Sequence, residues 1–172
     1  MALFSPQYLF HRVQEISPEF LQKIGVKSIL LDVDNTLSPH GAAEPEKEVP
    51  AWLNAVLQSG IHVMIVSNNS QERVQPFAAK LGLEFETKAA KPLPLGFNRA
   101  RKRLQCGKKE TAVIGDQLFT DMLGANLAGM TAILVEPIEL ETMLQFRVKR
   151  KLEIPILAWF RWRQERRKKD AE

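Results

Sequence analysis

Cysteine and long apolar runs are nearly absent from this sequence of 172 residues, and both absences limit what the chain can be. Cys106 is the single cysteine, so neither an internal disulfide nor a site of several cysteines around a metal can form. No apolar run approaches the length of a membrane-spanning helix, and the N-terminus lacks the basic and apolar regions of a secretory signal. We therefore expect a cytoplasmic protein.

Histidine is also scarce, which argues against a histidine-based metal site. His11, His40 and His62 have no helical or paired spacing to a second ligand type. We interpret them as structural or solvent-facing, with His40 the one candidate for a substrate contact because it lies in a segment rich in proline and glycine.

What is present is the composition of an ordinary globular domain, with 45% hydrophobic and 26% charged residues. The net charge of +4 is unevenly distributed, because ten Lys or Arg against four Asp or Glu lie from Arg147 onward. We expect one domain over residues 1–152, in which 1–25 are a helical lead-in, and a basic, aromatic C-terminal tail over 153–172.

Strands and helices alternate along the predicted domain. Apolar, β-branched runs predict strands over 26–32, 61–66, 83–85, 111–114 and 131–135, with helices between them. Ser5-Pro6 and Ser17-Pro18 each predict a helix start before the first strand. This order predicts an α/β fold, a three-layer Rossmann-like parallel sheet with helices on both faces.

The first predicted strand delivers two carboxylates. Asp32 and Asp34 are two residues apart, so in extended backbone both leave the same face of the strand. Two close carboxylates repel each other, and a cation between them or a shared proton offsets the repulsion. The alternative is structural: Asp34 and Asn35 form an Asx turn, and Asp32 only ends the strand.

Further polar residues follow later strands, and the carboxyl ends of parallel strands meet at one edge of the sheet. Ser67 follows the second strand, Lys91 comes after the third, and Asp116 and Asp121 follow the strand over 111–114. Carboxylates with a substrate phosphate suit Mg²⁺, and a lysine with a hydroxyl suits phosphoryl oxygens. Taken singly, Ser67 fits a turn, Lys91 a solvated surface position and Asp121 the first turn of a helix.

These residues resemble the four motifs of the haloacid-dehalogenase-like phosphohydrolases, in order. The first is Asp32-Val33-Asp34-Asn35-Thr36, the second ends in Ser67, the third is Lys91, with Lys88 as a competitor, and the fourth is Asp116 with Asp121. The sequences Asp-Asn-Thr-Leu, Val-Ser-Asn-Asn and Gly-Asp-Gln-Leu-Phe-Thr-Asp are similar to the small YqeG-type branch, subfamily IIIA. The resemblance covers residues 6 to 150.

The resemblance implies an Mg²⁺-dependent phosphatase. Asp32 would be the nucleophile and Asp34 the acid and base, and Ser67, Asn68 and Lys91 would bind the phosphate. Mg²⁺ would be held by Asp32, the backbone carbonyl of Asp34 and Asp116. Asp121 would be a water-mediated ligand or orient Lys91, and Thr36 would hold the loop or Asp34.

Substrate size is suggested by the short spacing between motifs. Only 34 residues separate Asp32 from Ser67, so we expect no large cap domain and an open site. Residues 154–169 combine tryptophan with arginine and lysine, which is typical of contact with an anionic membrane; the alternative is that the aromatic residues pack on the domain.

Three functions follow from these features. The first is hydrolysis of a lipid phosphate at the inner face of the membrane, because relatives of this branch include phosphatidylglycerophosphate phosphatases. The second is hydrolysis of a small soluble nucleotide or sugar phosphate. The third, from another class, is a phospho-accepting or RNA-binding module with incidental turnover. Nucleic-acid binding would depend on the charge of the tail alone, without a recognisable motif.

Overall fold

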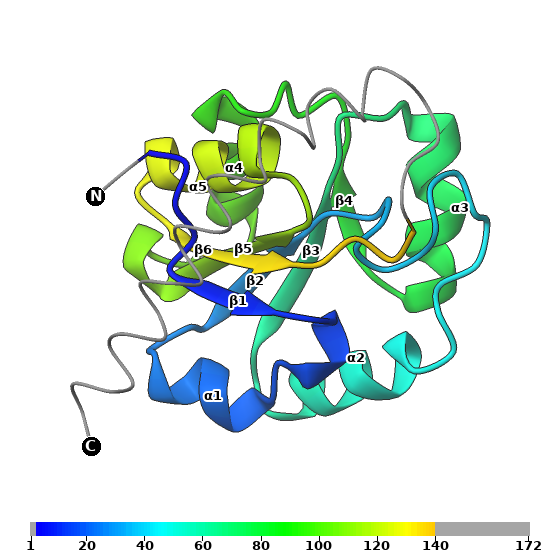
Figure 1. Cartoon of the computed structure of the whole chain (residues 1–172), viewed down its shortest axis with the longest axis horizontal. Helices are drawn as coiled ribbons and strands as arrows, with labels where there is room; N and C mark the ends of the chain where they lie inside the picture. Colours follow the sequence, from blue (N-terminus) through cyan, green and yellow to red (C-terminus); the bar gives the residue numbers. More distant parts are fainter. Residues whose placement is uncertain (1–2, 140–172) are drawn as a thin grey trace.

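A computed structural model describes residues 3–139, so the tail at 153–172 lies outside the described residues. Six parallel strands form one sheet in the order β1-β6-β5-β2-β3-β4 (Figure 1). The strands are β1 (Tyr8–Phe10), β2 (Ser28–Leu31), β3 (His62–Val66), β4 (Glu84–Glu86), β5 (Thr111–Gly115) and β6 (Thr131–Val135).

Helices cover both faces of this sheet, which confirms the predicted three-layer α/β architecture (Figure 1). One face is covered by α1 (Pro18–Lys23), α2 (Val49–Gln58) and α3 (Gln71–Leu81), and the other by α4 (Pro94–Arg103) and α5 (Leu123–Ala128). Alternate residues of β2 separate the two cores: Ile29 and Leu31 pack on the first face and Leu30 on the second. All three are buried, as a central strand of a parallel sheet requires.

The N-terminal segment differs from the prediction. Ser17 does begin a helix, α1, and its side chain accepts a hydrogen bond from the Phe20 N–H. The helix expected after Ser5-Pro6 is wrong, because Tyr8–Phe10 form the edge strand β1 beside β6. Gln7 extends this pairing, since its N–H donates to Ala132 O and its side-chain oxygen accepts from the Ala132 N–H. Pairing with a distant strand therefore outweighs the local capping signal.

Strand β2 lies at the centre of the sheet, where the chain order reverses. It pairs with β3 on one side and with β5 on the other, so the chain builds outward in one direction and then returns to the opposite side. Ligands of open α/β sheets bind beyond the carboxyl ends of the strands at such a point. Asp32 follows β2 directly, and its N–H donates to Ile114 O of β5 at 2.9 Å.

No inserted domain covers this edge within residues 3–139. The connection from β2 to β3 contains a turn-rich segment and α2, and the connection from β3 to β4 contains α3. Between residues 3 and 139, no helix combines the length and the apolar content needed to cross a bilayer.

Candidate active site

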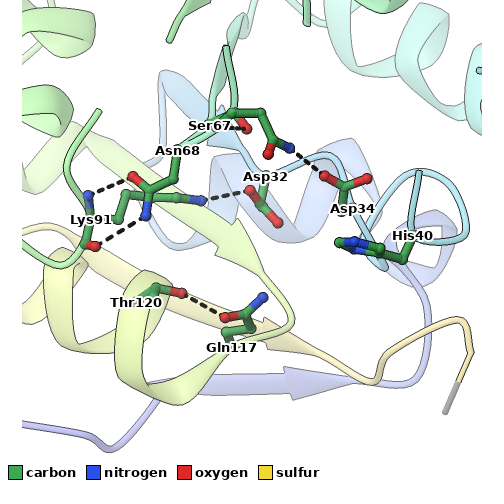
Figure 2. Close-up of a pocket in the computed structure, with 9 residues that line it drawn as sticks. Asp32, Asp34, His40, Ser67, Asn68, Lys91, Gln117 and Thr120 are labelled. Carbon is green, nitrogen blue, oxygen red and sulfur yellow. Dashed lines mark hydrogen bonds and ion pairs between the residues drawn. The ribbon is translucent and has the colours of Figure 1, made fainter. Parts of the chain in front are cut away.

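A pocket of about 190 Å³ opens at the carboxyl edge of the central strands (Figure 2). It is lined by Asp32, Asp34, His40, Ser67, Asn68, Asn69, Lys91, Gln117 and Thr120. These residues come from the ends of β2, β3, β4 and β5, so segments far apart in the sequence meet here. In Figure 2, Gln117 and Thr120 lie across the pocket from Ser67 and Asn68.

Lys91 bridges two of the predicted acids. Its Nζ donates to Asp32 Oδ1 at 2.6 Å and to Asp121 Oδ1 at 2.7 Å (Figure 2 shows the first contact). The three side chains are almost completely buried, with exposed fractions of 4% for Lys91, 9% for Asp32 and 1% for Asp121. Of the two roles considered for Asp121, the structure shows the contact that orients Lys91.

Burial and charge shift the pKa of both partners in the Lys91–Asp32 pair. Burial raises the pKa of Asp32 to about 7; the neighbouring Lys91 opposes this shift, whereas Asp121 and Asp34 add to it. Burial alone would lower the pKa of Lys91, but its contacts with Asp121 and Asp32 outweigh burial and hold it above the ordinary value. Lys91 is therefore charged at neutral pH, and Asp32 titrates near neutrality.

Three carboxylates converge beside this lysine. Asp32, Asp116 and Asp121 each offer an oxygen, and these oxygens all lie within 4.8 Å of one another. Three acids against one lysine leave an excess of negative charge in a buried space, which a divalent cation would balance. The donor set is entirely oxygen, as Mg²⁺ prefers, so these residues fit that ion.

Asp34 faces a different set of partners. Asn69 Nδ2 donates to its Oδ2 at 2.5 Å, and the Gly41 N–H and Arg73 Nη2 donate to its Oδ1 at 2.9 and 3.1 Å. Its carboxylate thus lies outside the group formed by Asp32, Asp116 and Asp121, although it lines the same pocket. This arrangement agrees with a role for the Asp34 carboxylate in proton transfer. Contact between Mg²⁺ and the backbone carbonyl of Asp34 stays a prediction, as does the proton transfer itself.

Ser67 and Asn68 follow β3 and differ in what they contact. Ser67 is buried, and its hydroxyl accepts a hydrogen bond from the Asn69 N–H at 3.1 Å. The side-chain amide of Asn68 instead holds the backbone of Lys91: its Nδ2 donates to Lys91 O at 3.1 Å, and its Oδ1 accepts from the Lys91 N–H at 2.7 Å (Figure 2). Both ends of that amide therefore contact the backbone of Lys91, and the phosphate-binding role expected of Asn68 stays a prediction.

Two further predictions concern Thr36 and Lys88. The Thr36 hydroxyl is buried and makes no hydrogen bond to any residue between 3 and 139, so its supporting role stays a prediction. Lys88 is exposed, whereas Lys91 occupies the pocket, so the structure favours Lys91 for the third motif. His40 lines the pocket, and its contact with the substrate stays a prediction.

Arg73 was not expected from the sequence. It lies in the first turn of α3, where a cation opposes the helix dipole. Its Nη2 donates to Asp34 Oδ1 and to Ala42 O, the latter at 2.8 Å, so it links α3 to the segment after β2. The unfavourable charge at a helix start was the available signal that this arginine has an anionic partner.

Comparison with known proteins agrees with this geometry. A family model described as haloacid dehalogenase-like hydrolase matches residues 19–129. The "Probable phosphatase YqeG" of Bacillus subtilis (strain 168) is 38% identical over 155 residues, which cover 90% of each chain. "Phosphatidylglycerophosphate phosphatase 1, chloroplastic/mitochondrial" of Arabidopsis thaliana is 25% identical over 154 residues, which cover 83% of this chain and 44% of that protein.

A solved structure, NagD from E. coli K-12, shares the fold. It superposes with a TM-score of 0.57 at 13% identity, covering 70% of this chain and 93% of that one.

Proposed function

We propose that this chain, which belongs to the haloacid dehalogenase-like hydrolases and is a phosphatase, hydrolyses phosphomonoesters through an aspartyl-phosphate on Asp32. The observation that carries the proposal is the buried group in which Lys91 contacts Asp32 and Asp121 while Asp116 lies beside them. It supports the proposal because the side chains to which we assign the roles of nucleophile, phosphate-binding cation and metal ligands lie together.

In the first step, Asp32 attacks phosphorus and the ester oxygen leaves. Lys91 holds Oδ1 of Asp32, so we assign the attack to Oδ2. A proton from Asp34 passes to the departing alkoxide, which leaves as the alcohol. The products of this step are the free alcohol, an acyl phosphate on Asp32 and an ionised Asp34.

In the second step, Asp34 takes a proton from a water molecule, which attacks the phosphorus of the acyl phosphate. Breaking the bond between phosphorus and Asp32 releases inorganic phosphate and restores both carboxyl groups. Ser67 and Lys91 bind the phosphoryl oxygens through both steps, and Asn68 fixes Lys91. Asp32, Asp116 and the Asp34 carbonyl would hold Mg²⁺, which supplies positive charge against the phosphoryl group.

For the substrate, we propose a lipid phosphate at the membrane surface, phosphatidylglycerophosphate or a similar lipid. The pocket is smaller than the clefts of about 300–1,000 Å³ that enclose whole drug-sized ligands, so it suits a headgroup whose acyl chains stay in the bilayer. The absence of a cap between residues 3 and 139 leaves room for a bilayer, and residues 154–169 would add peripheral contact with anionic lipid.

A small soluble phosphate is the second candidate, because the pocket would also admit the phosphate end of a sugar phosphate or a nucleotide. Phosphate release from phospholipids, sugar phosphates and nucleotides, each with Mg²⁺ and with EDTA, separates the two. We expect Mg²⁺-dependent release that is fastest on the lipid and is lost in Asp32→Asn. Glu44→Gln, a change at a side chain that is 73% exposed, serves as control. Faster turnover of a soluble ester would favour the second candidate.

Sedimentation with anionic vesicles, with and without residues 154–172, tests the tail separately. Equal sedimentation of both forms would exclude a contribution of the tail to membrane binding.

A further inference from the structure

The start of α4 presents two strongly exposed leucines. Leu95 and Leu93 have exposed fractions of 62% and 59%, the largest values among the large hydrophobic side chains of residues 3–139. Single exposed leucines are common on protein surfaces. Two of them two residues apart, separated only by Pro94, form a small apolar projection.

This projection lies at the same edge of the sheet as the pocket. It begins two residues after Lys91, whose ammonium lies in the pocket. Because all the strands are parallel, α4 starts at the carboxyl edge at which the pocket opens. Neither leucine lines the pocket, but both follow Lys91 closely at the same edge of the sheet, and we call the segment from Lys88 to Leu95 the rim.

The rim is also held in place. Asn68 binds the backbone of Lys91 through two hydrogen bonds, and the Leu93 N–H donates to Ala90 O at 2.9 Å. Because the backbone at this rim is already fixed, an apolar side chain there costs little backbone conformational entropy when it enters a lipid bilayer or binds a partner.

The sequence around the leucines is basic, although one of its lysines, Lys91, is buried against Asp32 and Asp121. Residues 88–103 contain six Lys or Arg and no Asp or Glu. Lys88 is exposed, and its N–H donates to Asn69 O, which places it beside a residue that lines the pocket. Lys102 is also exposed and lies seven residues after Leu95, on the same side of α4. Arg99 and Arg103 are paired with Glu86 and Glu84.

We propose that Leu93, Leu95 and Lys88 dock this rim on an anionic lipid bilayer. Leucines enter the boundary between headgroups and acyl chains, and lysines are attracted to anionic headgroups. This proposal rests on the proposed function. It adds an orientation to that function, because docking would turn the pocket toward a phosphate that projects from the membrane. The leucines favour lipid over nucleic acid, which would select cations alone.

The test is sedimentation of the full chain with vesicles of phosphatidylglycerol and phosphatidylcholine. We expect Leu93→Ser with Leu95→Ser to weaken partitioning about tenfold or more, because the apolar groups that would enter the bilayer are removed. Lys88→Gln should weaken binding to the anionic vesicles only. The control is Leu57→Ser, at a leucine that is 39% exposed on α2, which covers the opposite face of the sheet.

Each comparison retains the tail, so a difference between variants belongs to the rim. Partitioning of the double variant equal to that of the unsubstituted chain would overturn the proposal, and so would failure of the unsubstituted chain to bind. Equal binding to vesicles of pure phosphatidylcholine would overturn its anionic selectivity.

Hydrolysis of a water-soluble ester separates this proposal from the proposed function. The double variant should keep its rate on that ester, which also shows that it is folded. If the unsubstituted chain releases phosphate from no ester, the proposed function fails while the vesicle result still decides the docking surface. If it hydrolyses the ester but the rim variants bind vesicles normally, only the docking surface fails.

Discussion

Lys91 Nζ lies 2.6 Å from Asp32 Oδ1, and both side chains are buried. Each partner needs the other: the lysine offsets the repulsion among Asp32, Asp116 and Asp121, and the carboxylates keep the ammonium charged in a buried position. The contact therefore stabilises the buried charges, and under the proposed mechanism it also positions the nucleophile.

Replacing the lysine should reveal both roles. Removing one partner of a buried ion pair costs about 3–5 kcal/mol, so we expect Lys91→Met to lower the free energy of unfolding by about that amount without Mg²⁺. Phosphatase activity should be lost as well. Denaturant unfolding and phosphate release measure the two effects.

Lys88→Met is the matched control for this prediction, since Lys88 is exposed three residues earlier. It should change the free energy of unfolding by no more than about 0.5 kcal/mol. A Lys91→Met protein as stable as the control, and as active on a water-soluble ester, would contradict the role of the bridge.

The stability of the metal-free protein should depend on pH through Asp32. Because burial raises its pKa from 3.8 to about 7, the folded state keeps a proton that the unfolded state has released between these two values. Stability therefore falls as the pH rises through this window and is level above it. The melting temperature in EDTA, compared between the natural chain and Asp32→Asn, measures the contribution of this group. Parallel curves from pH 4 to pH 8 would refute it.

The two acidic residues Asp116 and Asp34 should respond differently to substitution. Asp116→Asn removes a carboxylate from the predicted metal ligands, so Mg²⁺ should no longer raise the melting temperature. Asp34→Asn should retain that thermal shift, because the Asp34 carboxylate contacts Asn69 and Arg73 and not the predicted metal ligands. It should lose activity, because the proposed acid and base is removed. Equal loss of the shift in both variants would show that the Asp34 carboxylate also binds the metal.

Asn68 is expected to act through Lys91. Asn68→Ala removes both hydrogen bonds to the Lys91 backbone, and we expect a loss of about 10–100-fold in kcat, as for other groups that orient a catalytic residue. The thermal shift with Mg²⁺ should be unchanged, since Asn68 is not among the residues predicted to bind Mg²⁺. A raised KM with normal kcat would instead indicate direct contact with the substrate.

The sequence was most informative where local pattern and chemistry coincide. Asp32, Ser67 and Asp116 each follow a buried strand, and a parallel sheet brings such strand ends together, so their convergence could be predicted without coordinates. The same reasoning could not assign Asn68 to the backbone of Lys91, because that contact depends on the path of two loops 23 residues apart.

Other features depend on long-range packing. The strand at Tyr8–Phe10 forms by pairing with the edge of β6, and the local sequence around residue 8 contains no signal for that distant partner. The helical segment after β5 begins with a π-helical turn at Leu118–Met122. That turn shifts the phase of the helix, so α5 buries Ala125 and Ala128 while Leu127 is 46% exposed.

The central claim is that Asp32 carries the phosphoryl group. Rapid mixing of the Mg²⁺-loaded protein with substrate, followed by an acid quench and peptide mass spectrometry, tests it most directly. We predict that the peptide containing Asp32 gains the mass of one phosphoryl group and that Asp34→Asn slows loss of this adduct. Phosphate release without any adduct on Asp32, or unchanged turnover by Asp32→Asn, would contradict the mechanism.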